Sequence, residues 1–141
     1  MQTFLPYPSF SESAAVLDRA RLGKQRVEAL QVLRAVTIPT YGWRNHPAAK
    51  MWRGFVPALA EYALAMTDEW IAQGHPDTVR PQLLEFTGSP IVYPPWLGDE
   101  ALHVSHRSNL IRKDPEFYRP LFGDIPDDLP YVWPSSSVDP T

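Results

Sequence analysis

The stretch MWRGFVPALAEYALAMTDEW, residues 51–70, decides the fold class, because large apolar side chains recur in it every three or four positions. The recurring residues are Trp52, Phe55, Leu59, Tyr62, Met66 and Trp70. This spacing places them on one face of a helix that packs against a core. We expect the helix to begin near Pro47 and to be kinked, or divided into two shorter helices, at Pro57. It should end at Gln73–Gly74, where glycine takes its usual C-terminal place.

Other segments also predict helices, and none demands a strand. Ser9 to Glu12 has the S-x-x-E form of a capping box and predicts a short helix through about Ala20, with Gly23 marking a bend. Further helical segments are expected at 24–36, near 81–86, at 99–113 and after 114. The prediction is a mainly α, compact single-domain helical bundle with long proline-rich loops. The domain should cover residues 1–123, with an acidic, proline-rich tail, residues 124–141, packed on it or extending from it.

Composition excludes several classes of protein. With 44% hydrophobic and 21% charged residues, the chain is typical of a globular protein in water. No apolar run approaches the roughly 20 residues of a membrane span, and the first residues, MQTFLPYP, lack the pattern of a secretory signal. We therefore expect a cytoplasmic protein with no membrane partner. The absence of cysteine excludes disulfides, thiolate metal sites and a cysteine nucleophile.

Charge is segregated along the chain, although the formal net charge is only −3. Residues 19–53 hold eight Lys or Arg and one acid, Glu28, whereas residues 114–141 hold six acids and one Arg. A basic region can attract phosphates whatever the total charge is, because the local field sets the attraction. A solvated surface of mixed charge is the alternative interpretation.

The segment LDRARLGKQRVEALQVL, residues 17–33, contains most of the helix expected at 24–36, which has a narrow polar stripe. The stripe consists of Lys24, Glu28 and Gln31. Arg26 and Arg34 project into the apolar arc instead, so each needs a partner. Two explanations stay open for them: an ion pair with a carboxylate such as Asp18, or a contact with a substrate.

The segment HVSHRSNLIRK, residues 103–113, places His103 and His106 one turn apart with Arg107 beside them. Histidines, hydroxyls and arginines on one short helix are typical of surfaces that position phosphates. A metal site that adds His46 is one alternative, although no HExxH-type frame is present. Helix capping and ordinary surface polarity are the other.

The segment YGWRNHP, residues 41–47, precedes a helix whose N-terminal amides attract anions. Arg44 and His46 lie close in sequence to Tyr41 and Trp43, whose flat rings can stack on an unpaired base. Aromatic side chains interleaved with arginine favour nucleic-acid binding, although tryptophan and tyrosine are more often core residues.

Four stretches together resemble a group of bacterial and phage proteins related to the endonuclease V-type pyrimidine-dimer DNA glycosylases. They are LDRARLGKQRVEALQVL, NHPAAKMWRG, EW at 69–70 and PPWLGDEALHVSHRSNLIRKDPEFYRPLFG. The resemblance covers most of the chain, whereas the likeness to the characterised phage enzyme is distant. It implies a mostly helical protein that flips nucleotides out of duplex DNA without a metal. In that family the N-terminal amine attacks C1′ of the damaged nucleotide, a glutamate on an early helix assists, and arginines hold the DNA backbone.

The resemblance carries over to some residues only. Arg26 falls where the family has a DNA-binding arginine. The family glutamate does not carry over, because Gly23 or Lys24 stands in its place, and Glu28 is the chemical replacement. Since the second residue is glutamine, too bulky for ordinary methionine removal, the amine belongs to Met1. An α-amino group ordinarily has a pKa of about 7.7 to 8, so a large neutral fraction exists at pH 7 to attack a sugar carbon.

We therefore expect a DNA glycosylase, with AP-lyase activity as a second step, that excises a damaged or modified base from double-stranded DNA. It should act as a monomer without metal or other cofactor, with Met1 and Glu28 as catalytic residues. The expected DNA contacts are Arg21, Lys24, Arg26, Arg44, His46, His103, His106 and Arg107. One alternative is a non-catalytic nucleic-acid or nucleotide-binding protein on the same scaffold, and the other is a His-based metal hydrolase.

Overall fold

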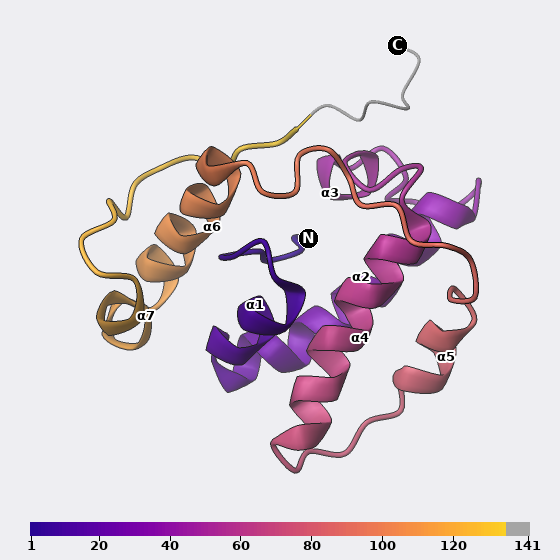
Figure 1. The fold of residues 1–141 in the computed structure, drawn as a ribbon, viewed down its shortest axis with the longest axis horizontal. Coiled ribbons are helices and arrows are strands. Elements are labelled where there is room, and N and C mark those ends of the chain that lie inside the picture. Colours follow the sequence, from indigo (N-terminus) through magenta and orange to yellow (C-terminus); the bar gives the residue numbers. More distant parts are fainter. Residues whose placement is uncertain (135–141) are drawn as a thin grey trace.

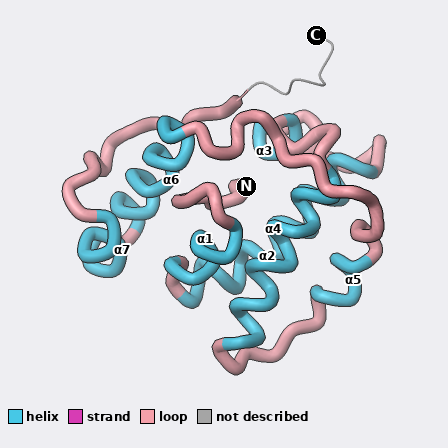
Figure 2. Tube along the Cα trace, in the orientation of Figure 1, coloured by secondary structure: helices cyan, strands magenta, loops and turns pink. Residues whose placement is uncertain are grey.

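The computed structural model describes residues 1–134, and within that range the chain forms seven helices and no strand (Figure 1, Figure 2). The helices are α1 (Phe10–Val16), α2 (Arg19–Thr37), α3 (Pro47–Lys50), α4 (Val56–Ala72), α5 (Arg80–Leu84), α6 (Glu100–Lys113) and α7 (Pro115–Phe122). The prediction of a mainly α fold with long loops is confirmed. Among the described residues, no helix combines the length and apolar character needed to cross a membrane.

The N-terminal segment runs through the middle of the molecule, between two groups of helices (Figure 1). On one side α1 and α2 pack against α4, and on the other α6 packs against α7. Residues 2–6 are all buried in the space between these groups. Chain termini are ordinarily exposed and poorly ordered unless something ties them down. The first residues are therefore an internal element of this fold.

The helix expected from Pro47 is divided into two, α3 and α4, which is one of the two arrangements expected at Pro57, but the break lies at residues 51–55, before that proline. Pro57 lies in the first turn of α4, where a missing backbone N–H removes no helical hydrogen bond. The helix ends at Ala72 with Gln73 as its C-cap, and Gly74 follows with a φ of 89°. Leu59 and Tyr62 are fully buried, as the spacing predicts. This face of α4 forms the centre of the core.

The boundary between the first two helices differs from the prediction. Ser9 caps α1 as expected, since its hydroxyl accepts a hydrogen bond from the amide of Glu12 at 3.2 Å. However, α1 ends at Val16 rather than near Ala20. Asp18 caps α2, its carboxylate accepting a hydrogen bond from a backbone amide of the first turn. The second helix thus begins five residues earlier than its expected start and includes most of the basic segment.

Gly23 lies inside α2, so the predicted bend at this residue is wrong. A Cβ atom built at Gly23 would lie 2.8 Å from two ring carbons of Trp70 on α4. The glycine therefore permits the two helices to approach closely, and this packing offsets the cost of about 1 kcal/mol that glycine imposes inside a helix.

The described part of the acidic tail, residues 124–134, packs along α6. The hydroxyl of Ser108 accepts a hydrogen bond from the amide of Leu129 at 3.0 Å, and the hydroxyl of Ser105 accepts one from Val132 at 3.1 Å. The remainder of the expected tail, residues 135–141, lies outside the described residues. The last described residues are thereby brought close to the N-terminal segment, since the ring centres of Tyr131 and Phe4 lie 6.5 Å apart.

Candidate active site

The extended N-terminal segment is held by side chains from both groups of helices. From α2, the amide nitrogen of Gln25 donates to the carbonyl oxygen of Gln2 at 2.9 Å, and its amide oxygen accepts from the backbone N–H of Phe4 at 2.9 Å. From α4, the hydroxyl of Tyr62 lies 2.8 Å from the carbonyl oxygen of Phe4. These hydrogen bonds satisfy backbone N–H and C=O groups that, in an extended segment, are ordinarily paired with a neighbouring strand.

Two histidines of α6 hold the same segment from the other side. His106 accepts a hydrogen bond from the backbone N–H of Leu5 at its Nδ1 atom, at 2.8 Å. His103 accepts from the amide of Gly98 at Nε2, at 3.0 Å, which leaves Nδ1 as the donor to the carbonyl oxygen of Leu5 at 2.8 Å. Both polar groups of the Leu5 backbone are thus satisfied by imidazoles.

Both histidines are neutral in the folded protein. Burial, reinforced by the proximity of His103, lowers the pKa of His106 from 6.5 to about 3. Burial also lowers the pKa of His103. Neutral imidazoles suit this position, because each ring accepts a hydrogen bond at one nitrogen, and protonation there would remove the acceptor.

Arg107 completes the attachment of the segment to α6. Its guanidinium donates to the carbonyl oxygen of Pro6 at 2.9 Å, forms an ion pair with Glu100 at 2.6 Å and lies over the ring of Tyr7. Together with its two histidine neighbours, this residue was expected to contact DNA. In the structure all three side chains hold the N-terminal segment in place, and the two imidazoles are fully buried.

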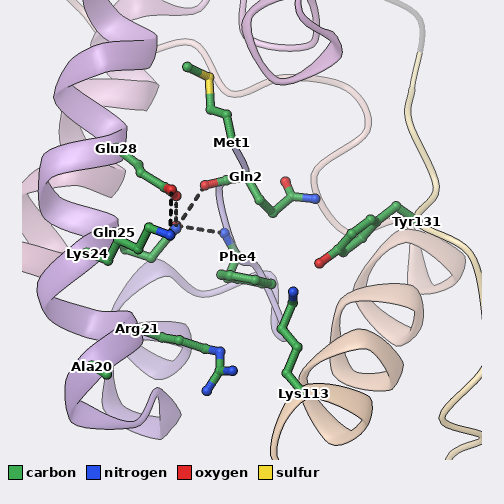
Figure 3. A pocket seen from close by; sticks show the side chains of 10 residues that line it. All are labelled: Met1, Gln2, Phe4, Ala20, Arg21, Lys24, Gln25, Glu28, Lys113 and Tyr131. Atoms are coloured by element: carbon green, nitrogen blue, oxygen red, sulfur yellow. Dashed lines mark hydrogen bonds and ion pairs between the residues drawn. The ribbon is translucent and has the colours of Figure 1, made fainter.

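A pocket of about 450 Å³ opens between α2, the N-terminal segment and the C-terminal end of α6 (Figure 3). It is lined by Met1, Gln2, Phe4, Ala20, Arg21, Lys24, Gln25, Glu28, Lys113 and Tyr131. The two residues expected to be catalytic, Met1 and Glu28, therefore lie on the same pocket, together with two of the expected DNA contacts. Among the described residues, Glu28 supplies the pocket's one carboxylate.

Glu28 is held by two neighbours on α2. The amide nitrogen of Gln25 donates to the Glu28 carboxylate at 2.8 Å, and the ammonium group of Lys24 lies 3.8 Å from it (Figure 3). The side chain of Glu28 is 15% exposed. The carboxylate therefore reaches the pocket while most of its surface is shielded from water.

The side chain of Arg21 extends to the pocket and is held in place by an ion pair. Its guanidinium pairs with Asp18 at 3.0 Å, and the buried hydroxyl of Tyr118 donates to the same carboxylate. Burial alone would raise the pKa of Asp18, but the hydrogen bonds from Tyr118 and Arg21 outweigh it and hold that pKa below 3.8. The pair leaves the Arg21 side chain 26% exposed, enough to meet a ligand.

Arg26 faces away from this pocket. Its guanidinium forms an ion pair with Asp77 at 2.5 Å and lies 4.8 Å from the ring centre of Trp70. The Asp77 side chain is only 3% exposed. Of the two explanations left open for Arg26, the structure has the ion pair, with Asp77 as the partner in place of Asp18.

Arg44 and His46 lie outside the pocket, at the start of α3. Arg44 is exposed and donates to the carbonyl oxygen of Pro39 at 3.1 Å. His46 caps α3 by accepting from the amide of Ala48 at 3.0 Å, and its ring stacks near the exposed ring of Trp43. Burial, and then the charge of the N-terminal ammonium group, lower the pKa of His46. His46 is therefore near the amine even though it does not line the pocket.

Six residues that line the pocket were not among the expected site residues: Gln2, Phe4, Ala20, Gln25, Lys113 and Tyr131. Helical spacing could have found Lys113, because it continues the face of His106 at seven residues' distance. Gln25 is a glutamine on an otherwise apolar face of α2, which is a signal of a buried hydrogen-bonding role. Tyr131 follows a proline-rich loop, and no periodic pattern points to it.

The residues of the metal alternative do not form a ligand set. Across residues 1–134, no group of three or more His, Cys, Asp or Glu side chains lies close enough together to hold a metal ion. His103 uses both ring nitrogens, and His106 uses Nδ1, in hydrogen bonds to backbone groups instead.

Comparison with known proteins gives one match. The model of a protein family described as pyrimidine dimer DNA glycosylase matches residues 1–81, which is more than half of the chain. The matched part contains Met1, the whole of α2 and the whole of α4, whereas α6 and the tail lie outside it. No curated protein matches the chain, and no solved structure does.

Proposed function

Because this chain belongs to the pyrimidine dimer DNA glycosylase family, we propose that it excises a damaged or modified base from double-stranded DNA at the pocket between the N-terminal segment and α2. In this proposal the α-amine of Met1 is the nucleophile and Glu28 moves the proton. The observation that carries the proposal is that one pocket contains both residues.

The proposed chemistry uses only groups of this chain and water. The amine nitrogen of Met1 bonds to C1′ of the nucleotide as the bond from C1′ to the base breaks, and the base leaves with that electron pair and takes a proton from solvent. The Glu28 carboxylate then accepts a proton from the attached nitrogen and passes it to the ring oxygen of the sugar. Opening of the ring gives a Schiff base. In the AP-lyase step water takes a proton from C2′, a double bond forms between C2′ and C3′, and the 3′-phosphate leaves with the electron pair of its bond to C3′; a second water then hydrolyses the Schiff base and frees the amine.

The attachment of the N-terminal segment supports a nucleophilic role for its amine. A terminal amine on a loose segment would lose much of its reactivity to disorder, whereas a held amine reacts as part of a pre-organised site. Here residues 2–6 are buried and bonded to α2, α4 and α6. Hydrogen bonds from two buried histidines and a buried glutamine fix the position of the first residues, and the amine is attached directly to this fixed segment.

Three cationic side chains around the pocket support a DNA substrate: Arg21, Lys24 and Lys113. Within the described part of the chain, Lys113 makes no hydrogen bond or ion pair, whereas its neighbour Arg112 is bonded to the carbonyl oxygen of Asp127. A cation without a protein partner beside a pocket is suited to a phosphate. One copy of the chain supplies every wall of the pocket, so we propose that the monomer is active.

Borohydride trapping on duplex DNA with an abasic site tests the proposal. The wild-type chain should form a covalent adduct, and Glu28→Gln should form it at least about a hundredfold more slowly, as expected when a proton-transfer group is lost. Glu85→Gln, which changes an exposed carboxylate outside the pocket, is the matched control and should react at the wild-type rate.

The outcomes separate the proposed activity from the binding alternative. No adduct with wild-type protein, together with salt-dependent DNA binding, would replace the proposal by a non-catalytic DNA-binding protein. An adduct that forms equally fast with Glu28→Gln would keep the amine chemistry and remove Glu28 from it.

A further inference from the structure

The side-chain amide of Gln25 has all of its hydrogen-bonding positions occupied. Its oxygen accepts from the backbone N–H of Phe4 at 2.9 Å and lies 2.7 Å from the hydroxyl of Tyr62. Its nitrogen donates to the carbonyl oxygen of Gln2 at 2.9 Å and to the carboxylate of Glu28 at 2.8 Å. The residue is 1% exposed, so water takes no part in these bonds.

These four contacts allow only one orientation of the amide. If its oxygen and nitrogen exchanged places, the N–H group of Phe4 would face a donor, and the oxygens of Gln2 and Glu28 would face an acceptor. Each such contact leaves a buried polar group unsatisfied, at a cost of about 1 to 3 kcal/mol. The nitrogen of Gln25 is therefore locked between the N-terminal segment and Glu28.

The same nitrogen binds both halves of the proposed site. The carbonyl oxygen of Gln2 belongs to the residue directly after Met1, and the carboxylate of Glu28 is the proposed proton carrier (Figure 3). Lys24, the other neighbour of Glu28, is 74% exposed and lies 3.8 Å away. An exposed lysine at that distance fixes a carboxylate weakly. Gln25 is thus the main contact that sets the direction of the carboxylate.

We propose that Gln25 is a positioning residue. It holds the Glu28 carboxylate and the Met1 amine in the relative positions that they need to react at one sugar carbon. The inference rests on the function proposed above. Gln25 itself touches no reacting atom. Its removal should slow the covalent step and leave DNA binding unchanged, because the cations that face the DNA lie elsewhere on the pocket.

Single-turnover trapping on abasic duplex DNA, with protein in excess, measures this effect. Gln25→Met keeps the size of the side chain and removes both of its donors. We expect the trapping rate to fall about tenfold to hundredfold, the range expected when reacting groups move by about 1 Å. The dissociation constant for the abasic duplex should change by less than about twofold.

Thr67→Val is the control for a purely structural effect. It removes a buried hydroxyl that donates to the carbonyl oxygen of Ala63 at 2.9 Å within α4, and it leaves every contact of Gln25 in place. The trapping rate of Thr67→Val should stay within about twofold of the wild type even where its thermal midpoint falls. If Gln25→Met unfolds below the assay temperature, Gln25→Glu replaces it, because this variant keeps an acceptor for Phe4 and opposes Glu28 with a second carboxylate.

A double-mutant cycle with Glu28→Gln decides whether Gln25 acts through the carboxylate. In the Glu28→Gln background, Gln25→Met should slow trapping by much less than it does in the wild type. Fully additive effects on the logarithm of the rate would overturn the proposal, and so would wild-type trapping by a folded Gln25→Met. Absence of trapping by the wild-type chain would instead overturn the proposed function itself, so the two failures are distinguishable.

Discussion

Lowering the pH from 7 to 5 should destabilise this protein, and the contribution of His106 can be calculated. The unfolded chain binds a proton at this residue below about pH 6.5, whereas the folded chain binds it only near pH 3, because the imidazole is buried and holds the amide of Leu5. The unfolded state therefore gains protons that the folded state lacks, and stability falls as the pH falls through this window. At about 1.4 kcal/mol per pH unit, His106 should cost about 2 kcal/mol of unfolding free energy between pH 7 and pH 5.

The other groups with shifted pKa values do not reverse this sign. His103 has a lowered pKa as well, so it adds to the loss over the same range. Asp18 has a pKa below 3.8, so its contribution to stability is lost only at a lower pH than this window. The net effect between pH 7 and pH 5 is therefore a loss of stability of at least the size calculated for His106.

Urea titrations at pH 7 and pH 5, followed by tryptophan fluorescence at constant ionic strength, measure the loss. His106→Asn is the test variant, because an asparagine oxygen can accept the amide of Leu5 but takes up no proton in this range. The variant should be less stable than the wild type at pH 7, from lost packing. Its own loss between pH 7 and pH 5 should be about 2 kcal/mol smaller. Equal losses in the two proteins would refute the assignment of a buried, neutral His106.

Three further substitutions test other parts of the account. Lys113→Ala should reduce the salt dependence of DNA binding by about one phosphate contact, whereas Arg80→Ala, on the distant α5, should leave it unchanged; equal slopes would remove Lys113 from the DNA surface. Gly23→Ala should destabilise the protein by about 1 to 3 kcal/mol in urea titrations, because its Cβ would meet the ring of Trp70, and a more stable variant would show that the helices separate easily. Arg26→Met should cost about 3 to 5 kcal/mol of stability by leaving its buried carboxylate partner unpaired, while DNA affinity stays unchanged; weaker DNA binding with normal stability would return Arg26 to the DNA surface.

The helices were predictable where one face of the chain meets the core. The spacing from Trp52 to Trp70 predicted α4, and the capping box at Ser9 predicted the start of α1. The prediction of a bend at Gly23 was wrong because it relied on the low helix propensity of glycine. The helix continues there because Gly23 packs against Trp70, which lies 47 positions away in the sequence. Tertiary packing routinely outweighs a propensity difference of about 1 kcal/mol.

The histidines of α6 show why part of the site was not predictable. A helix with polar residues on several faces is ordinarily exposed, so His103 and His106 were expected at the surface. Both are buried because the backbone of Leu5, about 100 residues away in sequence, satisfies them. No local pattern in either segment reveals such a pairing. By contrast, the family resemblance pointed to the amine of Met1, and Glu28 was offered as a chemical replacement for the family glutamate; the two residues line one pocket.

The most direct test of the central claim is peptide mapping of the borohydride-trapped adduct by mass spectrometry. The proposal predicts that the sugar fragment is attached to the α-amine of Met1, in the N-terminal peptide. Attachment to a lysine of the pocket, such as Lys24 or Lys113, would contradict the role of the N-terminal amine and move the nucleophile to a side chain.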